Sequence, residues 1–257
     1  MLPPRDLAFF TVRLHFVAHR TLSFPKYGAA NLIRGQFGKE LFERQPDLYQ
    51  RLFAPPHRAE GPSGLHDPPR PYVLRTANLD ARTFAPGDAL DFSVHVFDPL
   101  LANDFAEFPI EHRVLRLETP AAAVSRVRVE FLSPTELKNA PRPDFGPLFA
   151  RIRDRVSALR ALYGPGPLEI DFKAMGDRAA EIQTAVLDIR DVARARTSRH
   201  TGQQHQISGF VGYAEYEGAL TEFVPYLEAA RWTGVGRQTV WGKGEIQVRL
   251  LTEIPPQ

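Results

Sequence analysis

A glycine-rich segment holds the residues of this sequence whose types and spacing best suit chemistry with a phosphate. Glycine lacks a Cβ atom and tolerates positive φ, so consecutive backbone N–H groups can converge on a phosphate. Arg237 and Lys243 add positive charge, and the rings of Trp232 and Trp241 can stack on unpaired bases. The glycines of this segment are Gly234, Gly236, Gly242 and Gly244. The alternative is a tight loop that closes a sheet, with both tryptophans in the core.

A second segment, rich in arginine, histidine and glutamine, precedes the glycine-rich segment. Its cationic residues are Arg190, Arg194, Arg196, Arg199, His200 and His205, and the glutamines Gln203, Gln204 and Gln206 lie on both sides of His205. Such a segment can track phosphates while glutamines hydrogen-bond base edges or riboses, and it then predicts steep salt dependence of binding. The alternative is a solvated loop. No carboxylate stands near His200 and His205 to complete a metal shell, so we predict no bound metal.

Composition excludes several classes of protein. The 257 residues include no cysteine, which removes disulfides, thiolate nucleophiles and cysteine-based metal sites. A charged fraction of 24% and the lack of any apolar run of roughly 20 residues argue against a membrane protein. Charged residues also interrupt the first apolar pattern, so we expect no signal peptide and a cytoplasmic protein.

Hydrophobic periodicity indicates the elements that must position these residues. Alternation predicts a half-buried strand over Leu7–Val17. An apolar stripe from Phe145 to Tyr163, opposed by arginines and followed by Gly164-Pro165, predicts a helix. The other expected elements are helices over Tyr27–Phe42 and Leu220–Ala230, and strands over Tyr72–Thr76, Ala89–Phe97, Arg126–Phe131, Thr184–Val192, Ile207–Tyr216 and Glu245–Leu251.

The order of elements predicts an α+β protein built from two tandem ferredoxin-like (RRM-like) domains. The second half follows the order strand, helix, strand, strand, helix, strand, which is the ferredoxin-like arrangement. In the first half no second helix is evident between Asp98 and Glu118, so we expect that helix to be shortened or missing. With a boundary at Thr119–Ala123, the predicted domains cover residues 1–119 and 124–257.

Four segments together resemble a known family. They are Phe24–Gly28 with Leu32–Gly38, Pro71–Arg75, Phe131–Lys138, and the stretch from Ala195 to the glycine-rich segment. In their content and order they resemble the CRISPR-associated endoribonucleases of the RAMP superfamily, which process precursor RNA. The glycine pattern is the most specific of the four, because it follows a helix and precedes the last strand.

The resemblance implies a function and a set of RNA-binding residues. It implies metal-independent cleavage of repeat RNA by attack of a 2′-hydroxyl, which leaves a cyclic phosphate and needs no cofactor. The implied partners are CRISPR repeat RNA or processed crRNA, and a multisubunit CRISPR complex. Residues implied to bind RNA are Arg196, Ser198, Arg199, His200, Gly234, Gly236, Arg237, Gly242, Lys243 and Gly244.

The implied reaction requires a general base and a general acid, and histidine suits both near neutral pH. Members of the family commonly carry a histidine in or near the first helix, but Ser23–Glu43 contains none. We therefore expect His19 to be the catalytic histidine, with Lys26 and Tyr27 as phosphate or proton partners. Two alternatives stay open: an inactive RNA-binding subunit of a CRISPR complex, and a protein-interaction module whose glycine loop is structural.

Overall fold

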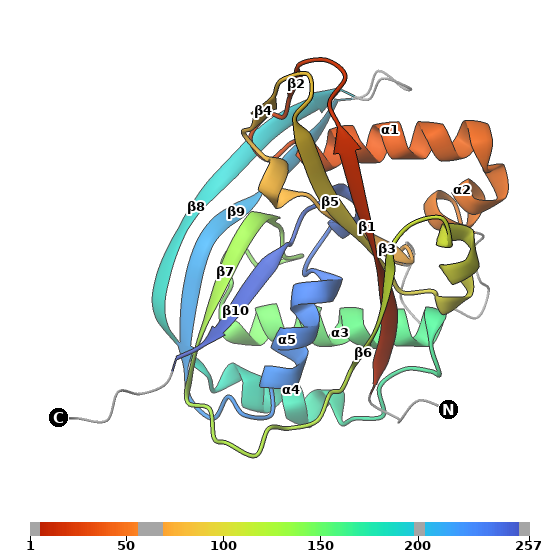
Figure 1. The fold of residues 1–257 in the computed structure, drawn as a ribbon. Coiled ribbons are helices and arrows are strands. Elements are labelled where there is room, and N and C mark those ends of the chain that lie inside the picture. The colour runs from red at the N-terminus through yellow and green to blue at the C-terminus, as the bar shows by residue number, and fades with distance from the viewer. Residues whose placement is uncertain (1–5, 56–68, 198–203, 252–257) are drawn as a thin grey trace. The chain divides into compact units, whose positions relative to one another are not determined.

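The chain consists of two compact units, which the computed structural model describes over residues 6–55, 69–197 and 204–251 (Figure 1). Residues 1–117, 154–169 and 239–242 form the first unit. The second unit contains residues 118–153, 170–238 and 243–257. The strands of each sheet are nevertheless contiguous in sequence, because those of the first sheet all precede residue 118 and those of the second all follow it.

The first unit has the connectivity of a ferredoxin-like domain. Its elements are β1 (Leu7–Val17), β2 (Leu22–Ser23), α1 (Ala29–Arg44), α2 (Pro46–Phe53), β3 (Tyr72–Arg75), η1 (Ala77–Leu79), β4 (Thr83–Phe84), β5 (Ala89–Val96), η2 (Pro99–Phe105) and β6 (Ile110–Leu115). Strands β3, β5, β1 and β6 form an antiparallel sheet in that order. This is the order expected of a ferredoxin-like sheet, in which the first and third strands are central.

A short 3₁₀ helix replaces the second helix of this domain. η2 begins at Pro99, and the side chain of Asp98 accepts a hydrogen bond from the backbone N–H of Leu100 at 3.1 Å. The element is only seven residues long. The prediction of a shortened second helix is therefore confirmed.

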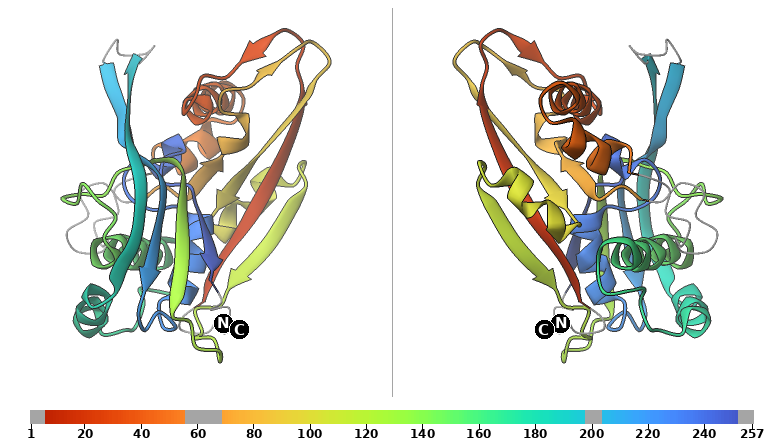
Figure 2. Two further views of the ribbon diagram at one scale, coloured as in Figure 1. Left: turned by 90° about the vertical axis from the view of Figure 1, so that its left-hand side faces the viewer. Right: turned by 90° about the vertical axis from the view of Figure 1, so that its right-hand side faces the viewer.

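The core of the first unit lies on one face of its sheet. Phe10, Val12 and Leu14 of β1 are buried there, together with apolar residues of α1, α2 and η2. β2 and β4 form a small separate ribbon, which Figure 2 shows beyond the end of β1. That ribbon leads the chain from the sheet into α1.

The second unit repeats the arrangement with regular helices. Its elements are β7 (Arg126–Thr135), α3 (Phe145–Tyr163), α4 (Phe172–Ala180), β8 (Gln183–Thr197), β9 (Gln204–Glu217), α5 (Val224–Thr233) and β10 (Ile246–Leu250). From Asp154 onward α3 belongs to the first unit, as does η3 (Thr239–Trp241). The antiparallel sheet has the order β10-β7-β9-β8, and its curved strands β8 and β9 are the longest (Figure 1).

Aromatic packing joins the helices of the second unit to its sheet. Phe145 of α3 lies 5.1 Å from Tyr216 of β9, between ring centroids, and Phe149 lies 4.7 Å from Phe223. All four rings are buried. The predicted α+β class with two ferredoxin-like domains is confirmed, while α4 and the edge strand β6 were not predicted.

None of the helices within the described residues is sufficiently long and apolar to pass through a membrane.

Candidate functional site

The turn that precedes α1 carries two of the predicted catalytic residues. Phe24 anchors it: the side chain is buried against Phe84, and its backbone N–H donates to the carbonyl of Arg82 at 2.8 Å. Tyr27 has φ of 57°, a left-handed conformation that is uncommon for a residue other than glycine. The surrounding hydrogen bonds, including Gly28 N–H to the carbonyl of Pro25 at 3.0 Å, hold this conformation. The turn therefore presents Lys26 and Tyr27 in a fixed geometry.

Asp80 caps helix α1 from a distant part of the chain. Gly28, the residue before the helix, has no side chain to cap it. Instead Oδ1 of Asp80 accepts hydrogen bonds from the backbone N–H groups of Gly28 at 3.0 Å and Ala29 at 2.9 Å. A carboxylate at this position satisfies helix donors and interacts favourably with the helix dipole. These two N–H groups are thus held by the protein's own carboxylate.

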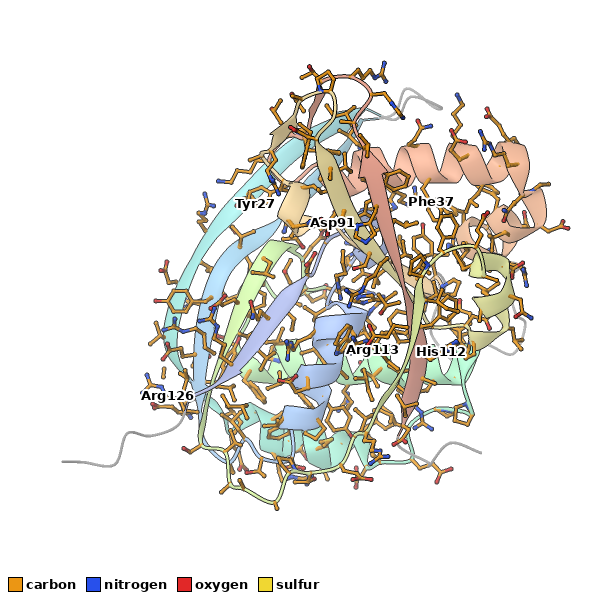
Figure 3. All side chains as sticks on the ribbon, in the orientation of Figure 1. Tyr27, Phe37, Asp91, His112, Arg113 and Arg126 are labelled. Atoms are coloured by element: carbon orange, nitrogen blue, oxygen red, sulfur yellow. The ribbon has the colours of Figure 1, made fainter. Side chains whose placement is uncertain are left out.

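The predicted catalytic side chains differ in their surroundings. The Nζ atom of Lys26 lies 5.3 Å from the ring centroid of Tyr27, so the structure brings these two together. Figure 3 shows Tyr27 at the N-terminal end of α1, and Phe37 on the side of α1 that faces the sheet. His19 is exposed and lies in the segment between β1 and β2. Its assignment as the catalytic histidine stays a prediction.

Backbone hydrogen bonds fold the two ends of the glycine-rich segment against the end of β7. The N–H of Val235 donates to the carbonyl of Gly244 at 2.9 Å, and the N–H of Gly244 donates to the carbonyl of Pro134 at 3.1 Å. Gly244 has φ of 70°, and a Cβ atom there would lie 1.8 Å from the Val235 carbonyl oxygen. Only glycine fits this position. Gly234 and Gly236 also have positive φ, as a tightly folded loop of glycines requires.

Glu136 ties the two cations of the glycine-rich segment together. Its Oε2 lies 2.6 Å from Nζ of Lys243, and its Oε1 lies 3.0 Å from a guanidinium nitrogen of Arg237. Lys243 is only 1% exposed and also donates to Oε1 of Gln238 at 3.1 Å. Arg237, in contrast, is 61% exposed. Lys243 therefore holds the loop from within, and Arg237 is the cation that the loop presents to solvent.

The electrostatics of this cluster depend on pH. Partial burial raises the pKa of Glu136, but the hydrogen bonds and charges of Lys243 and Arg237 outweigh burial, so its net pKa lies below the ordinary value of 4.5. Burial lowers the pKa of Lys243, and the carboxylate of Glu136 partly offsets that effect. Because the pKa of Glu136 is lowered on folding, its ionised form stabilises the fold above about pH 4.5, and this contribution is lost as pH falls through the lowered pKa.

Glu136→Gln is expected to reduce the free energy of unfolding at pH 7 by about 2 kcal/mol, because the buried ammonium of Lys243 loses its counter-charge. As pH falls through the lowered pKa of Glu136, the wild-type carboxyl is protonated as well, and the difference should shrink. Urea unfolding over a series of falling pH values measures this. Glu228→Gln, which breaks the partly exposed ion pair with Arg231, is the control and should change the free energy by under about 1 kcal/mol. A difference for Glu136→Gln that does not shrink at any pH at which the protein stays folded would contradict this electrostatic role.

The middle of the glycine-rich segment packs within the first unit, against the start of α1. Gly242 has φ of 73°, and a Cβ atom there would lie 2.1 Å from the Cβ of Ala30. The ring of Trp241 lies 5.5 Å from the guanidinium carbon of Arg34 in α1. Both tryptophans are half-buried rather than enclosed in a core. Residues 239–242 of the glycine-rich segment thus pack against α1, a part of the first unit that is far away in sequence.

The arginine-rich segment differs from the predicted loop. β8 continues to Thr197 and pairs with β9 from Gln204, so that Arg196 is opposite His205 in a regular hairpin. Ser198, Arg199 and His200 lie outside the described residues. Their roles and that of Arg196 stay predictions.

The described residues contain no group of three or more histidines, aspartates or glutamates placed to hold a metal ion. Asp80, Glu136 and Arg34, which organise the candidate site, were not singled out by the sequence analysis. Their contacts span long chain separations, so neither periodicity nor motif spacing could reveal them. The segments Leu32–Gly38 and Phe131–Lys138, which contain Arg34 and Glu136, carried the available signals.

Two parts of the chain match known protein families. Residues 129–246, which include the whole glycine-rich segment, match the family described as CRISPR-associated endoribonuclease Cas6. Residues 7–104 match a second family model, described as an N-terminal domain. No curated protein matches the chain.

Solved structures share the fold over nearly the whole chain. Cas6 (TTHB231) of Thermus thermophilus is 18% identical with a TM-score of 0.62, over 95% of this chain and 99% of that one. Cas6 (TTHA0078) in a product complex is 15% identical with a TM-score of 0.57, over 95% and 99%. A partial Cas6-RT-Cas1–Cas2 complex is 10% identical with a TM-score of 0.61, over 96% of this chain and 46% of the longer one.

The structure is that of a protein with two ferredoxin-like domains and a glycine-rich loop before its last strand. Residues 129–246 thus match the family of CRISPR-associated endoribonucleases Cas6, and the chain shares the fold of solved Cas6 structures over nearly its whole length.

Proposed function

We propose that this protein cleaves CRISPR precursor RNA within its repeats. The observation that carries the proposal is the glycine-rich segment, which lies inside the range matched by the Cas6 family and exposes Arg237 on a rigid scaffold. Rigid presentation of an arginine suits phosphate, because the guanidinium binds two oxygens at once. The family match and the built loop support the same function.

The proposed chemistry uses a nucleophile that the RNA itself supplies. A 2′-hydroxyl attacks the adjacent phosphorus, the P–O5′ bond breaks, and the products are a cyclic 2′,3′-phosphate and a 5′-hydroxyl. His19 would accept the proton of the 2′-hydroxyl or return one to the departing 5′-oxygen. Lys26, exposed at the turn before α1, would stabilise charge on the phosphate, and Tyr27 would hold a phosphate oxygen or carry a proton. No metal or cofactor takes part in this scheme.

A second candidate function is binding without cleavage. The resemblance leads us to expect a histidine in or near the first helix, but α1 (Ala29–Arg44) contains none. Under this alternative the chain would retain processed crRNA within a multisubunit CRISPR complex, and the glycine-rich segment would serve binding alone.

One assay separates the two functions. The protein is incubated with labelled repeat RNA in a chelator at two salt concentrations, beside an RNA of the same composition in scrambled order. Cleavage of the repeat at one position supports the proposed function. Tight, salt-sensitive retention without cleavage supports the alternative. Failure to retain repeat RNA at low salt would contradict both.

The exposed guanidinium of Arg237 should contribute to salt-dependent RNA binding. Arg237→Gln is expected to lower affinity for repeat RNA about three- to tenfold at low salt. It should also reduce the slope of log K against log salt by about 0.7, the value for one phosphate of a single strand. Filter binding from low to high salt measures both quantities.

Lys173→Gln is the matched control, because Lys173 is exposed on α4 and pairs with Asp177. It should leave the slope unchanged. A wild-type slope for Arg237→Gln would show that this side chain does not contact phosphate.

A further inference from the structure

The guanidinium of Arg34 lies beside two aromatic rings that come from two other elements of the first unit. Its central carbon is 5.0 Å from the ring centroid of Phe53 in α2 and 5.5 Å from that of Trp241 in η3. Arg34 itself belongs to α1. Its Nε atom is buried with no hydrogen-bond partner in the part of the chain that the structure describes. The guanidinium thus contacts two rings, and cation–π attraction favours its position beside them.

The segment that carries Trp241 is fixed at both of its ends. Val240, just before it, packs against the hydrophobic core of the unit. Gly242, just after it, approaches Ala30 so closely that no side chain would fit, and its N–H donates to the carbonyl of Thr239 at 3.0 Å. The backbone of Trp241 is thereby placed beside α1. The cation–π contact with Arg34 then acts on the orientation of its ring.

A planar guanidinium is suited to this task and an ammonium is not. Arginine is delocalised and weakly hydrated, so it stacks on ring faces, whereas lysine is a compact and strongly hydrated charge. The buried hydroxyl of Tyr72 also lies near this charge: burial raises its pKa to about 12, an increase that the charges of Arg34 and Arg70 partly offset. The guanidinium therefore lies beside a buried hydroxyl, while the side chain of Arg34 as a whole is half-buried.

We propose that Arg34 is a positioning residue, which orients Trp241 and so fixes the glycine-rich segment against the start of α1. For RNA binding, this inference rests on the proposed function. A tryptophan of fixed orientation offers a base a preformed stacking surface, whereas a mobile ring must first be ordered. Loss of Arg34 should therefore weaken RNA binding more than it slows cleavage of bound RNA.

The experiment uses Trp241 as its own reporter. The chain has two tryptophans, so Trp232→Phe leaves Trp241 as the sole tryptophan. In this background Arg34→Met removes the charge and the planar group, and Arg34→Lys keeps the charge alone. Arg44→Met, at an exposed position of the same helix that pairs with Glu40, is the control. Emission maximum, acrylamide quenching and circular dichroism are recorded without RNA, followed by KM and kcat with repeat RNA.

Both Arg34 variants are expected to shift the emission of Trp241 and to raise its quenching constant about twofold, while Arg44→Met changes neither. KM should rise about tenfold with kcat within about twofold of the parent. Arg34→Lys is the variant expected to remain folded, because it keeps a long cationic side chain at a half-buried position.

Wild-type emission and quenching in a folded Arg34→Met variant would overturn the proposal, as would full rescue of both fluorescence and KM by lysine. Should the parent itself fail to bind repeat RNA, the proposed function fails, and the fluorescence comparison alone still decides whether Arg34 orients Trp241.

Discussion

Replacing His19 with alanine is expected to lower the rate of repeat-RNA cleavage by about 10²- to 10⁴-fold, the range typical of a lost general acid or base. RNA affinity should change less than about twofold, since a single exposed imidazole adds little to phosphate binding. The side chain is exposed between β1 and β2, so its removal leaves no cavity and should not affect folding. Single-turnover cleavage with excess protein measures the chemical step without product release.

His112→Ala is the matched control, because His112 is also exposed but lies on β6. It should cleave at the wild-type rate. Equal rates for His19→Ala and the wild type would remove His19 from the mechanism and leave the general base to another group.

Gly244→Ala is expected to destabilise the protein by about 3 kcal/mol or more and to abolish RNA retention. The alanine would occupy a left-handed conformation, which costs roughly 1–2 kcal/mol. In addition, its Cβ would lie 1.8 Å from a backbone oxygen, so the loop itself must move. Urea unfolding and filter binding measure the two effects.

Two other glycines separate the cost of the backbone conformation from the cost of the close contact. Gly87 has φ of 94° but open space around it, so Gly87→Ala should cost only the strain, about 1–2 kcal/mol. Gly35, within α1, has open space and no positive φ, and Gly35→Ala should stabilise by about 0.5–1 kcal/mol. If all three variants behaved alike, the close packing of the glycine-rich segment would not be what makes Gly244 necessary.

Elements with a strong local pattern could be predicted from the sequence. β1 begins and ends at Leu7 and Val17 as predicted, because its alternation extends over the whole strand. Helix α3 likewise extends over Phe145–Tyr163. In both cases one face is apolar and buried, so local periodicity and tertiary packing agree.

Elements without such a pattern were missed or shortened. β6 is an edge strand whose Glu111, His112 and Val114 are exposed, so its sequence lacks a buried face. The outer parts of β8 and β9 are rich in arginine and glutamine, and backbone pairing rather than an apolar face continues the hairpin there. No element was therefore predicted over β6, and the outer parts of β8 and β9 were interpreted as a loop.

The candidate site shows the same division between local and distant interactions. Glycine spacing predicted the loop, since the need for positive φ at Gly234 and Gly244 is a local property. The cap that Asp80 provides to Gly28 spans 52 residues, and the ion pair of Glu136 with Lys243 spans 107. Such contacts follow from the tertiary fold alone. The contact with Glu136 makes Lys243 a buried residue that stabilises the loop.

Removing a single oxygen atom from the RNA tests whether a 2′-hydroxyl is the nucleophile. Repeat RNA is prepared with one 2′-deoxy nucleotide immediately upstream of the mapped cleavage position and incubated with the protein in a chelator. We expect binding equal to that of all-ribose RNA and no cleavage at that position, whereas the all-ribose RNA should yield a cyclic phosphate and a 5′-hydroxyl. Cleavage of the deoxy-substituted RNA at the normal rate would contradict this role of the 2′-hydroxyl.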